Sequence, residues 1–270
     1  MELVTMHTHT NYTGHGHGTV AELVDAAEAA KLGAIAVTEH YPMSAAMDPD
    51  NVVSMAWDRL PDYLIDIAAA AAAHPEMQVI PGCEIDWLGG QEDRDFSALD
   101  FSNFIHVLGS VHYLDGWAFD DPAQKARWHD VGVDSVWRRY FEVWCQAASC
   151  TDMPFTCMAH PDLVKKFGYR PSFNPQPLYD EAAEAVQSSG RMVEVNTSGL
   201  TYACAELFPA PDLLRTFCRA GIPCSIGTDA HDPAVVNRNL MPGLAAMYEA
   251  GYRCVTVPTS TGDRRQIALE

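Results

Sequence analysis

The stretch PLYDEAAEAVQSSGRMVEVN (residues 177–196) places a helix-forming run before a strand-forming run, with Gly190 between them. The same order of helix, glycine and strand recurs at residues 211–227 and 233–257. Glycine is well suited to the left-handed conformation that ends many helices. Units of this kind in series predict parallel strands joined by right-handed helical crossovers.

Helix-like and strand-like segments alternate along the rest of the chain as well. Strands are predicted at residues 3–6, 34–38, 78–85, 103–111, 155–159, 191–196, 222–227 and 254–257. Helices are predicted after a capping box at Thr19 and Glu22, and at residues 56–74, 134–148, 177–189, 211–220 and 233–250. This alternation predicts an α/β fold in a single domain that spans residues 1–270.

The composition is typical of a globular enzyme. Of the 270 residues, 48% are hydrophobic and 20% are charged. The formal net charge of −19 would repel a nucleic-acid backbone, although a small phosphorylated ligand is compatible with it. No secretory leader is visible at the N-terminus, and the longest aliphatic run, residues 67–73, is too short to span a bilayer. The eight cysteines form no CxxC pair and are expected to be free thiols in a reducing cytoplasm.

Histidine and carboxylate residues stand at or just after the ends of six predicted strands. The set comprises His7, His9, His15, His40, Glu84, His112, His160, Asp229 and His231. Residues that follow nearly every strand gather at one mouth of a closed barrel, whereas an open sheet would concentrate them at one switch point. The set exceeds the four ligands that one zinc ion takes and suits two or three divalent ions. The sequence therefore predicts a polynuclear metal site on a closed α/β barrel.

The spacing within this set favours shared ions. One residue separates His7 from His9, and one separates Asp229 from His231, so each pair points to one side of an extended segment. Glu84 lies at a strand end, and the two oxygens of its carboxylate can bridge two cations. Zinc, manganese and iron all suit these nitrogen and carboxylate donors.

Other polar residues have two interpretations each. His15 is preferred to His17 as a ligand within the glycine-rich loop TGHGHG (residues 13–18). Glu39 either orients an imidazole or is a surface carboxylate, and Asn196 either hydrogen-bonds a substrate or ligand or caps a turn. Structural or exposed roles are expected for His74, His106 and His129, of which only His129 is a candidate for contact with a substrate.

Two long loops and one aromatic helix complete the expected organisation. Residues 88–102 and 114–132 are predicted to form lids over the site. The predicted helix at 134–148 carries a set of aromatic residues that are expected to be core rather than interface: Trp137, Tyr140, Phe141 and Trp144.

Together, the short motifs resemble one known family. HTH (7–9), TEH (38–40), AHPDL (159–163) and TDAH (228–231) resemble the polymerase and histidinol phosphatase (PHP) family. The segments most similar to its histidinol-phosphate phosphatase branch are GSVHYLDGWAFDD (109–121), VWRRYFEVWCQAA (136–148), AHPDLVKKFG (159–168) and EVNTSGL (194–200). The resemblance extends over almost the whole chain.

This resemblance implies a distorted (β/α)7 TIM-like barrel with a trinuclear site of zinc, iron or manganese. It assigns one ion to His7, His9, Glu84 and Asp229. It assigns the second ion to Glu84, His112 and His160, and the third to His15, His40 and His231. The implied reaction is hydrolysis of a phosphomonoester, namely L-histidinol phosphate to L-histidinol and phosphate in histidine biosynthesis.

The expected mechanism follows from this metal site. A water that bridges two cations, which share Glu84, loses a proton near neutral pH and attacks phosphorus. The cations also neutralise charge on the phosphoryl oxygens. Departure of the alkoxide needs a proton or a third ion, and Asp229 or His231 is placed to help.

Basic residues after His160 are candidates for binding the substrate phosphate. Lys165, Lys166 and Arg170 can donate charge-assisted hydrogen bonds to it, unless they form a solvated face of the loop. The resembling branch carries basic residues, including a phosphate-binding arginine, where Thr201 and Tyr202 stand in this chain. Either another basic residue covers the phosphate or the substrate is a different phosphoester.

Two other classes of function are compatible with parts of the sequence. A metal hydrolase of the amidohydrolase type also begins with HxH on a barrel strand, but His15 and His40 do not fit its pattern. A non-enzymatic module of the PHP family would be expected to have lost ligands, whereas all nine positions are filled here. The expected partner is a small phosphorylated substrate, with no nucleic acid or membrane, on a monomer or homo-oligomer.

Overall fold

Seven parallel strands form the centre of the molecule. The computed structural model describes residues 1–89 and 101–269. In spatial order, the strands are β1 (Leu3–Thr5), β2 (Leu32–His40), β3 (Gln78–Asp86), β4 (His106–Ser110), β7 (Cys157–Met158), β8 (Met192–Asn196) and β9 (Cys224–Gly227). Each neighbouring pair in this order is parallel, as the helix–glycine–strand units predicted.

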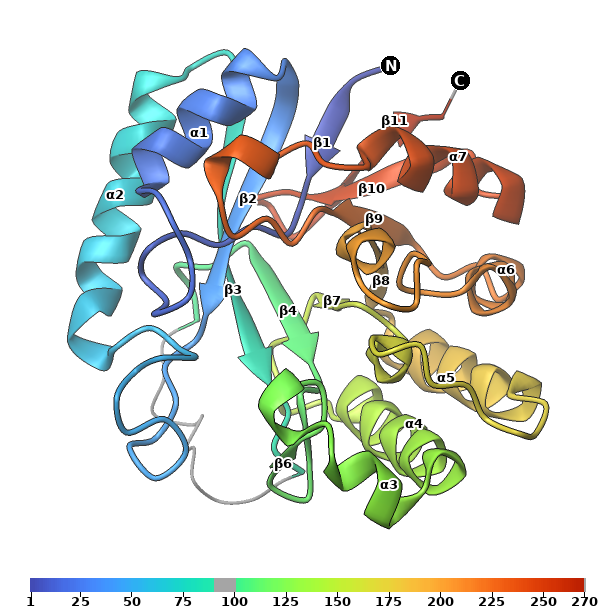
Figure 1. Cartoon of the computed structure of the whole chain (residues 1–270). Coiled ribbons are helices and arrows are strands. Elements are labelled where there is room, and N and C mark those ends of the chain that lie inside the picture. The colour runs from blue at the N-terminus through green and yellow to red at the C-terminus, as the bar shows by residue number, and fades with distance from the viewer. Residues whose placement is uncertain (90–100, 270) are drawn as a thin grey trace.

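The first and last strands of this order meet, so the sheet closes into a barrel (Figure 1). Met6 N donates a hydrogen bond to Ile226 O at 2.8 Å. Just beyond the two strands, a parallel bridge joins Thr8 to Ala230. The closure rests on these few contacts, and β7 is only two residues long. A distorted seven-stranded α/β barrel is therefore confirmed.

Helices surround this barrel and cover its outer face (Figure 1). They are α1 (Val20–Ala29), α2 (Leu60–Ala73), α3 (Arg127–Val131), α4 (Val133–Ser149), α5 (Gln176–Ser189), α6 (Pro211–Arg219) and α7 (Leu240–Ala250). The aromatic side chains of α4 are core, as expected: each of Trp137, Tyr140, Phe141 and Trp144 is no more than 1% exposed.

Local sequence signals set several helix ends. The Thr19 hydroxyl accepts from Glu22 N while the Glu22 carboxylate accepts from Thr19 N, which confirms the capping box of α1. Gly190 ends α5 in the left-handed region with a φ of 70°. Gly221 and Gly251 have positive φ after α6 and α7, so the predicted helix–strand junctions are confirmed.

Residues 233–250 do not form the single helix that the sequence predicted. A short 3₁₀ turn over Pro233–Val235 precedes Asn239, and α7 begins only after that residue. Asp232 caps the short turn by accepting from Ala234 N at 2.8 Å. Asn239 has a φ of 58°, a left-handed conformation that interrupts a right-handed helix.

The last predicted strand lies outside the barrel, so the expectation that it adds to the parallel strands was wrong. β10 (Cys254–Pro258) pairs antiparallel with β11 (Arg264–Ala268). The free edge of β9 is already taken by the chain that follows β1, which leaves no barrel edge for β10. The hairpin lies beside the N-terminus, where Arg265 contacts Glu2 at 2.6 Å (Figure 1).

Of the two segments expected to act as lids, only the second is described in full. Most of the segment 88–102 lies outside the described residues. Residues 114–132 contain the hairpin of β5 (Tyr113–Leu114) with β6 (Trp117–Ala118), a 3₁₀ turn over Pro122–Gln124, and α3. Trp128 anchors this segment, because its indole is 1% exposed and donates to Phe119 O at 2.7 Å.

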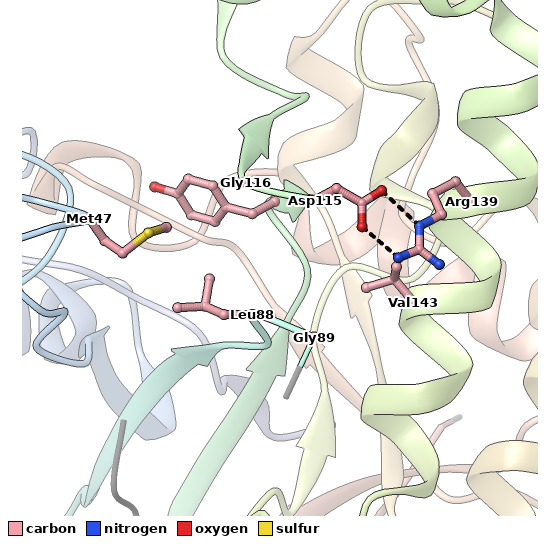
Figure 2. A pocket seen from close by; sticks show the side chains of 8 residues that line it. Met47, Leu88, Gly89, Asp115, Gly116, Arg139 and Val143 are labelled. Carbon is pink, nitrogen blue, oxygen red and sulfur yellow. Dashed lines mark hydrogen bonds and ion pairs between the residues drawn. The ribbon is translucent and has the colours of Figure 1, made fainter. Parts of the chain in front are cut away.

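Two cavities lie away from the predicted ligands. One of about 50 Å³ is lined in part by the ion pair of Asp115 with Arg139 (Figure 2). Another of about 410 Å³ lies at the amino ends of β7 and β8, beside Thr156 and Arg191. The donors of Arg191 are directed at backbone carbonyls such as Ala147 O, at 2.7 Å. Neither cavity is lined by a predicted metal ligand among the described residues.

Two further expectations concerned the cysteines and membrane-spanning helices. All eight cysteines are free thiols, as predicted. Among the helices of the described residues, none is both long and apolar enough to cross a membrane.

Candidate metal centre

The carboxyl ends of six barrel strands bring all nine predicted ligands to one mouth of the barrel. We call these residues the metal centre: His7, His9, His15, His40, Glu84, His112, His160, Asp229 and His231. Two of them have left-handed backbone conformations, with φ of 25° at His160 and 53° at Asp229. Such conformations are costly for residues with a side chain and tend to be retained at functional sites.

Glu84 occupies the middle of the metal centre, and each of its oxygens faces different histidines. Oε2 lies 3.2 Å from His7 Nε2 and 3.1 Å from His40 Nδ1. Oε1 lies 2.8 Å from His160 Nε2 and 3.8 Å from His112 Nε2. The carboxylate is 1% exposed. This geometry suits the predicted role of Glu84 as a bridge between two ions.

The HxH and DxH pairs meet where the barrel closes. Asp229 Oδ1 lies 3.6 Å from His7 Nε2 and 3.4 Å from His9 Nε2. The ligand atoms of these three residues lie within 4.8 Å of one another. His7 and His9 are both fully buried, and their two Nε2 atoms are 3.0 Å apart. The structure thus brings together three of the four residues of the first predicted ligand set, and the fourth, Glu84, lies 3.2 Å from His7 Nε2.

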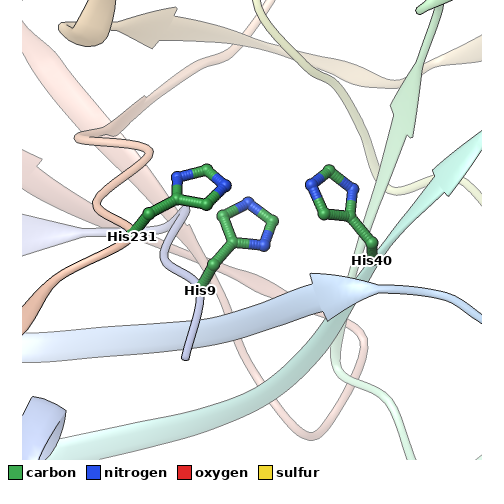
Figure 3. Close-up of side chains that lie close together, drawn as sticks. All are labelled: His9, His40 and His231. Carbon is green, nitrogen blue, oxygen red and sulfur yellow. The ribbon is translucent and has the colours of Figure 1, made fainter. Parts of the chain in front are cut away.

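The third group lies at the outer side of the mouth and includes one more histidine than predicted. Figure 3 shows His9, His40 and His231 directed toward one another, and their ligand atoms lie within 4.8 Å. His15 Nε2 is 3.1 Å from His231 Nε2, and its ring centroid is 5.2 Å from that of His40. The loop that carries His15 is tight, because a Cβ on Gly16 would stand 1.9 Å from Thr10 O.

Oxygen acceptors hold the outer ring nitrogens of four of these histidines. His7 Nδ1 lies 2.9 Å from Glu194 Oε1, and His112 Nδ1 lies 2.6 Å from Asp86 Oδ1. Backbone carbonyls perform the same task at the other two, where Val52 O contacts His15 Nδ1 at 3.0 Å and Asp229 O contacts His231 Nδ1 at 3.0 Å. A proton on Nδ1 leaves Nε2 as a free lone pair that faces the centre.

These lone pairs supply the physical argument for bound cations. His15 and His231 each direct Nδ1 at a carbonyl, so their Nε2 atoms, 3.1 Å apart, are both acceptors in the neutral rings. Acceptors facing acceptors repel one another unless a positive charge lies between them. The donor set of imidazole and carboxylate therefore fits divalent zinc, manganese or iron.

The ionisation of the buried carboxylates agrees with this argument. Burial opposes the charge on Glu84, but His7 and His40 outweigh burial and hold its pKa well below the usual range. The pKa of Asp229 is lowered in the same way, against burial, by His7 and by a hydrogen bond from His9. Burial and the charge of His9 lower the pKa of His231 to about 3. The centre thus offers two charged carboxylates and, at His231, a neutral imidazole at neutral pH, the forms that bind metals.

The three basic residues predicted to bind phosphate have different environments. Lys165 is fully buried, and its Nζ lies 2.8 Å from Asp162 and 2.7 Å from Leu207 O. Arg170 is 39% exposed and pairs with Glu206 at 3.0 Å. These contacts place both groups in a network around the loop at 205–210 and not among the ligands of the metal centre.

Lys166 is the basic residue that lies beside the metal centre. Its Nζ is 2.9 Å from Asp120 Oδ2 and 4.9 Å from the centroid of the Tyr202 ring. Burial alone would lower its pKa, but the charge of Asp120, with a smaller effect from Asp229, raises it. Thr201, the neighbour of Tyr202, turns its hydroxyl to Ser198 O at 2.7 Å. Lys166 therefore stands where the expected basic residues are missing.

Glu39 and Asn196, which had two interpretations each, both contact residues of the metal centre. Glu39 is fully buried, accepts from the Thr10 hydroxyl at 2.6 Å and lies 3.8 Å from His9 Nδ1, so it is not a surface carboxylate. Asn196 has both suggested roles. Its Nδ2 donates to Asp229 Oδ2 at 3.3 Å, while its Oδ1 accepts from Ser198 N at 3.0 Å.

Histidines predicted to be structural lie outside the metal centre. His106 is fully buried and contacts Thr156 Oγ1 at 3.1 Å. His74 ends α2 and lies 3.0 Å from Asp25. His129 lies on α3 with its ring edge-on to Tyr169.

Three carboxylates of the site had not been predicted from the sequence. Glu194 on β8 and Asp86 on β3 hold histidines, and Asp120 holds Lys166. A charged residue within an apolar strand, as in MVEVN, is the signal that could have identified Glu194. β8, which supplies no predicted ligand, thus supplies a residue that supports the ligands.

Known proteins resemble this chain over most of its length. The sequence matches the PHP domain family over residues 5–198. A protein of Deinococcus radiodurans named "Probable histidinol-phosphatase" is 33% identical over 256 residues, which cover 94% of this chain and 96% of the relative. Asp229 and His231 lie beyond the stretch that matches the family but within the part of the molecule that completes the barrel.

Two solved structures share the fold. One from Listeria monocytogenes has a TM-score of 0.80 at 22% identity and covers 88% of this chain and 99% of its own. The other is a histidinol phosphate phosphatase of Lactococcus lactis complexed with zinc, L-histidinol and phosphate. It has a TM-score of 0.78 at 19% identity and covers 96% of this chain and 97% of its own. By its sequence and its fold, this chain belongs to the PHP domain family.

Proposed function

We propose that this chain, a phosphoric monoester hydrolase like the relatives it resembles, hydrolyses L-histidinol phosphate to L-histidinol and phosphate. The observation that carries the proposal is Glu84, whose two oxygens face separate histidine groups at one barrel mouth. A shared carboxylate of this kind suits a site for two or three divalent ions. The similarity to the relative named histidinol-phosphatase covers nearly the full length of both chains.

The metal centre would hold the ions in the three groups described above. When bound, divalent ions lower the pKa of water so that it can attack phosphorus, and they neutralise charge on the phosphoryl group. The residues of the chain set the geometry. Glu84 would bridge two ions, and Asn196 orients Asp229 through a hydrogen bond at 3.3 Å.

We assign phosphate binding to Lys166. Its ammonium group is fixed by Asp120 at 2.9 Å and is 16% exposed, so it can donate to an anion that enters the mouth. Lys165 and Arg170, which the sequence also suggested, have their donors directed at Asp162 and Glu206. All three basic residues are ion-paired, so the place of Lys166 near Asp229 and Tyr202 is what favours it among the three candidates.

Departure of the alkoxide is the step in which we propose a role for Asp229 and His231. His231 is a poor proton donor, because burial and His9 lower its pKa to about 3. Asp229 is ionised for the reason given above. We therefore propose that both residues would help by holding a cation, which would supply positive charge to the departing oxygen, and not as acids.

The presence of Tyr202 in place of a basic residue favours a second candidate substrate. The branch that this chain resembles has basic residues at this loop, whereas the Tyr202 ring lies 4.9 Å from Lys166 Nζ and is 39% exposed. A different small phosphomonoester would then be the substrate of the same metal centre. The free thiols of the chain suit a reducing compartment, and we propose the cytoplasm.

The test is phosphate release by purified protein that has been loaded separately with zinc, manganese or iron. L-Histidinol phosphate is compared with p-nitrophenyl phosphate and a panel of small phosphomonoesters, and protein treated with a chelator is the control. We expect the highest kcat/KM with L-histidinol phosphate. Preference for another ester would replace the substrate, and absence of any phosphatase activity in protein with a full metal content would reject the reaction class.

A further inference from the structure

We infer that Glu194 is the positioning residue that fixes two of the ligand groups of the metal centre relative to each other. The inference rests on the proposed metal-dependent function. It concerns a residue of β8, the one barrel strand that supplies no proposed ligand. Three site elements converge on this one carboxylate, namely the His7 ring, the His160 backbone and the Asn196 amide.

The first contact fixes the imidazole of His7. Glu194 Oε1 accepts from His7 Nδ1 at 2.9 Å, and both side chains are at most 1% exposed. A carboxylate has only acceptors, so the proton of the neutral ring must lie on Nδ1. His7 Nε2 is then left as a lone pair toward Glu84 and Asp229.

The second contact fixes the backbone that carries another ligand. Glu194 Oε2 accepts from His160 N at 2.8 Å. His160 has a φ of 25°, which is unusual for a residue with a side chain, and this hydrogen bond helps to hold it there. His160 belongs to the group with Glu84 and His112, whereas His7 belongs to the group with His9 and Asp229. Glu194 therefore connects the two groups, with one oxygen on each.

A third contact extends the network to a carboxylate ligand. Glu194 Oε2 also accepts from Asn196 Nδ2 at 3.2 Å, and the same nitrogen lies 3.3 Å from Asp229 Oδ2. Asn196 thus joins the supporting carboxylate to the ligand carboxylate. Its orientation is set at the other end, where Asn196 Oδ1 accepts from the Ser198 hydroxyl at 2.6 Å.

The surrounding chain is shaped to fit this carboxylate closely. A Cβ on Gly227 would stand 2.0 Å from Glu194 Oε1 and 2.5 Å from His7 Cβ. Glu194 is 1% exposed, so it has no access to solvent that could replace these partners. Only glycine at position 227 leaves room for β9 to pack against the side chains of Glu194 and His7.

Glutamine cannot reproduce this arrangement, although it is almost the same size. It has one acceptor oxygen, whereas His7 Nδ1 and His160 N each need their own acceptor. If the amide nitrogen faces His7, the ring must carry its proton on Nε2 and can no longer bind a metal there. If the nitrogen faces His160 N, two donors meet at the present 2.8 Å contact.

The experiment measures metal affinity in Glu194→Gln, with Glu181→Gln, at an exposed position of α5, as the matched control. Apoproteins are titrated with zinc against a chromophoric chelator, and cobalt(II) absorption reports the ligand geometry. We expect zinc affinity about 10- to 100-fold weaker and an altered cobalt spectrum in Glu194→Gln, because loss of a partner that orients a metal ligand has effects of this size. Glu181→Gln should match the wild type in both.

A double-mutant cycle with His7→Ala separates positioning from general support of the fold. If Glu194 acts through His7, Glu194→Gln should weaken zinc binding much less when His7 is already absent. The contact with His160 N remains in the double variant, so part of the loss is expected to persist. A loss as large as that in the wild-type background would show no coupling to His7 and would overturn the assignment, as would wild-type affinity and cobalt spectrum in Glu194→Gln. Both readouts are independent of substrate, so lack of histidinol phosphatase activity in the wild type would reject the proposed substrate but not this inference.

If Glu194→Gln does not fold, Glu194→Asp replaces it in the titrations. Aspartate keeps both acceptors and the charge but is shorter by one methylene group, so it cannot reach His7 and His160 together. Weaker zinc binding with a folded apoprotein is expected. Wild-type zinc affinity and cobalt spectrum in Glu194→Asp would overturn the inference.

Discussion

Lys165 and Lys166 are adjacent in the sequence, but their ammonium groups pair with carboxylates in different surroundings. Lys165 Nζ lies 2.8 Å from Asp162, and both side chains are fully buried. Lys166 Nζ lies 2.9 Å from Asp120, and both of these side chains are 16% exposed beside the metal centre. Substitution of the two neighbouring lysines is therefore expected to have different effects.

Substitution of Lys166 should affect catalysis more than stability. Lys166→Ala removes a charge-assisted donor to the substrate phosphate, and such hydrogen bonds contribute about 1.5–3 kcal/mol. We expect kcat/KM for the preferred phosphoester to fall by about 10- to 100-fold, with unchanged metal content. Lys166→Arg should restore part of the activity. Wild-type kinetics in Lys166→Ala would show that phosphate is bound elsewhere.

Substitution of Lys165 should affect stability instead. Lys165→Met leaves the Asp162 carboxylate buried without its cation, and loss of one partner of a buried pair costs about 3–5 kcal/mol. Urea unfolding of the metal-loaded protein measures this difference. Unchanged unfolding together with lost phosphatase activity would instead identify Lys165 as the phosphate-binding residue.

Glu84 should be needed for more than one metal ion. Its two oxygens face different histidine groups, so Glu84→Ala is expected to reduce the bound metal by more than one ion per chain. The histidine groups would remain, which allows one residual ion of lower affinity. Metal content after dialysis, measured by mass spectrometry, checks the result. Retention of the wild-type metal content would exclude a bridging role.

The metal-free protein should lose stability as the pH rises above neutrality. Burial lowers the pKa of His112, but the charge and hydrogen bond of Asp86 outweigh it and raise that pKa to about 10. Hydrogen bonds to Asp229 and Glu39 outweigh burial and raise the pKa of His9 to about 9. A histidine whose pKa is raised by folding stabilises the protein fully below its unfolded pKa, about 6.5, and this contribution is lost as the pH approaches the folded value.

Thermal unfolding of chelated protein between about pH 6.5 and 8.5 tests this expectation. Tm should fall across the window, because the folded protein keeps the protons of His9 and His112, whereas the unfolded chain releases them above about pH 6.5. Metal-loaded protein should show a smaller fall, since cations replace those protons and the ligands are already neutral. A Tm of the metal-free protein that increases with pH would contradict the prediction.

The gathering of the nine histidine and carboxylate residues at one mouth could be predicted, because their positions follow from local sequence. A strand of parallel type ends at a fixed face of a barrel, and the pairs at 7 and 9 and at 229 and 231 have the spacing of neighbours in extended chain. The capping box at Thr19 and the glycine after α5 are also local signals. These predictions therefore did not depend on knowing which strands are neighbours.

The missed features depend on contacts between distant segments. The burial of Lys165 requires Leu207 O and Glu206, which arrive from another loop. The pairing of β10 with β11 follows from closure of the barrel by β1, and closure is a property of the whole sheet. Glu194 carries no local pattern that shows which histidine it will contact, because His7 is 187 residues away.

Because the metal centre spans the seam where the barrel closes, it can be completed only late in protein synthesis. The chain after β1 pairs with the chain after β9, and His231 at that seam contacts His15 from the first loop. His7, His9 and His15 leave the ribosome first, but the site they share with Asp229 and His231 can form only after nearly the whole chain has been made. A chain that lacks its last barrel strand also lacks Asp229 and His231, so only the completely closed barrel is expected to bind every ion tightly.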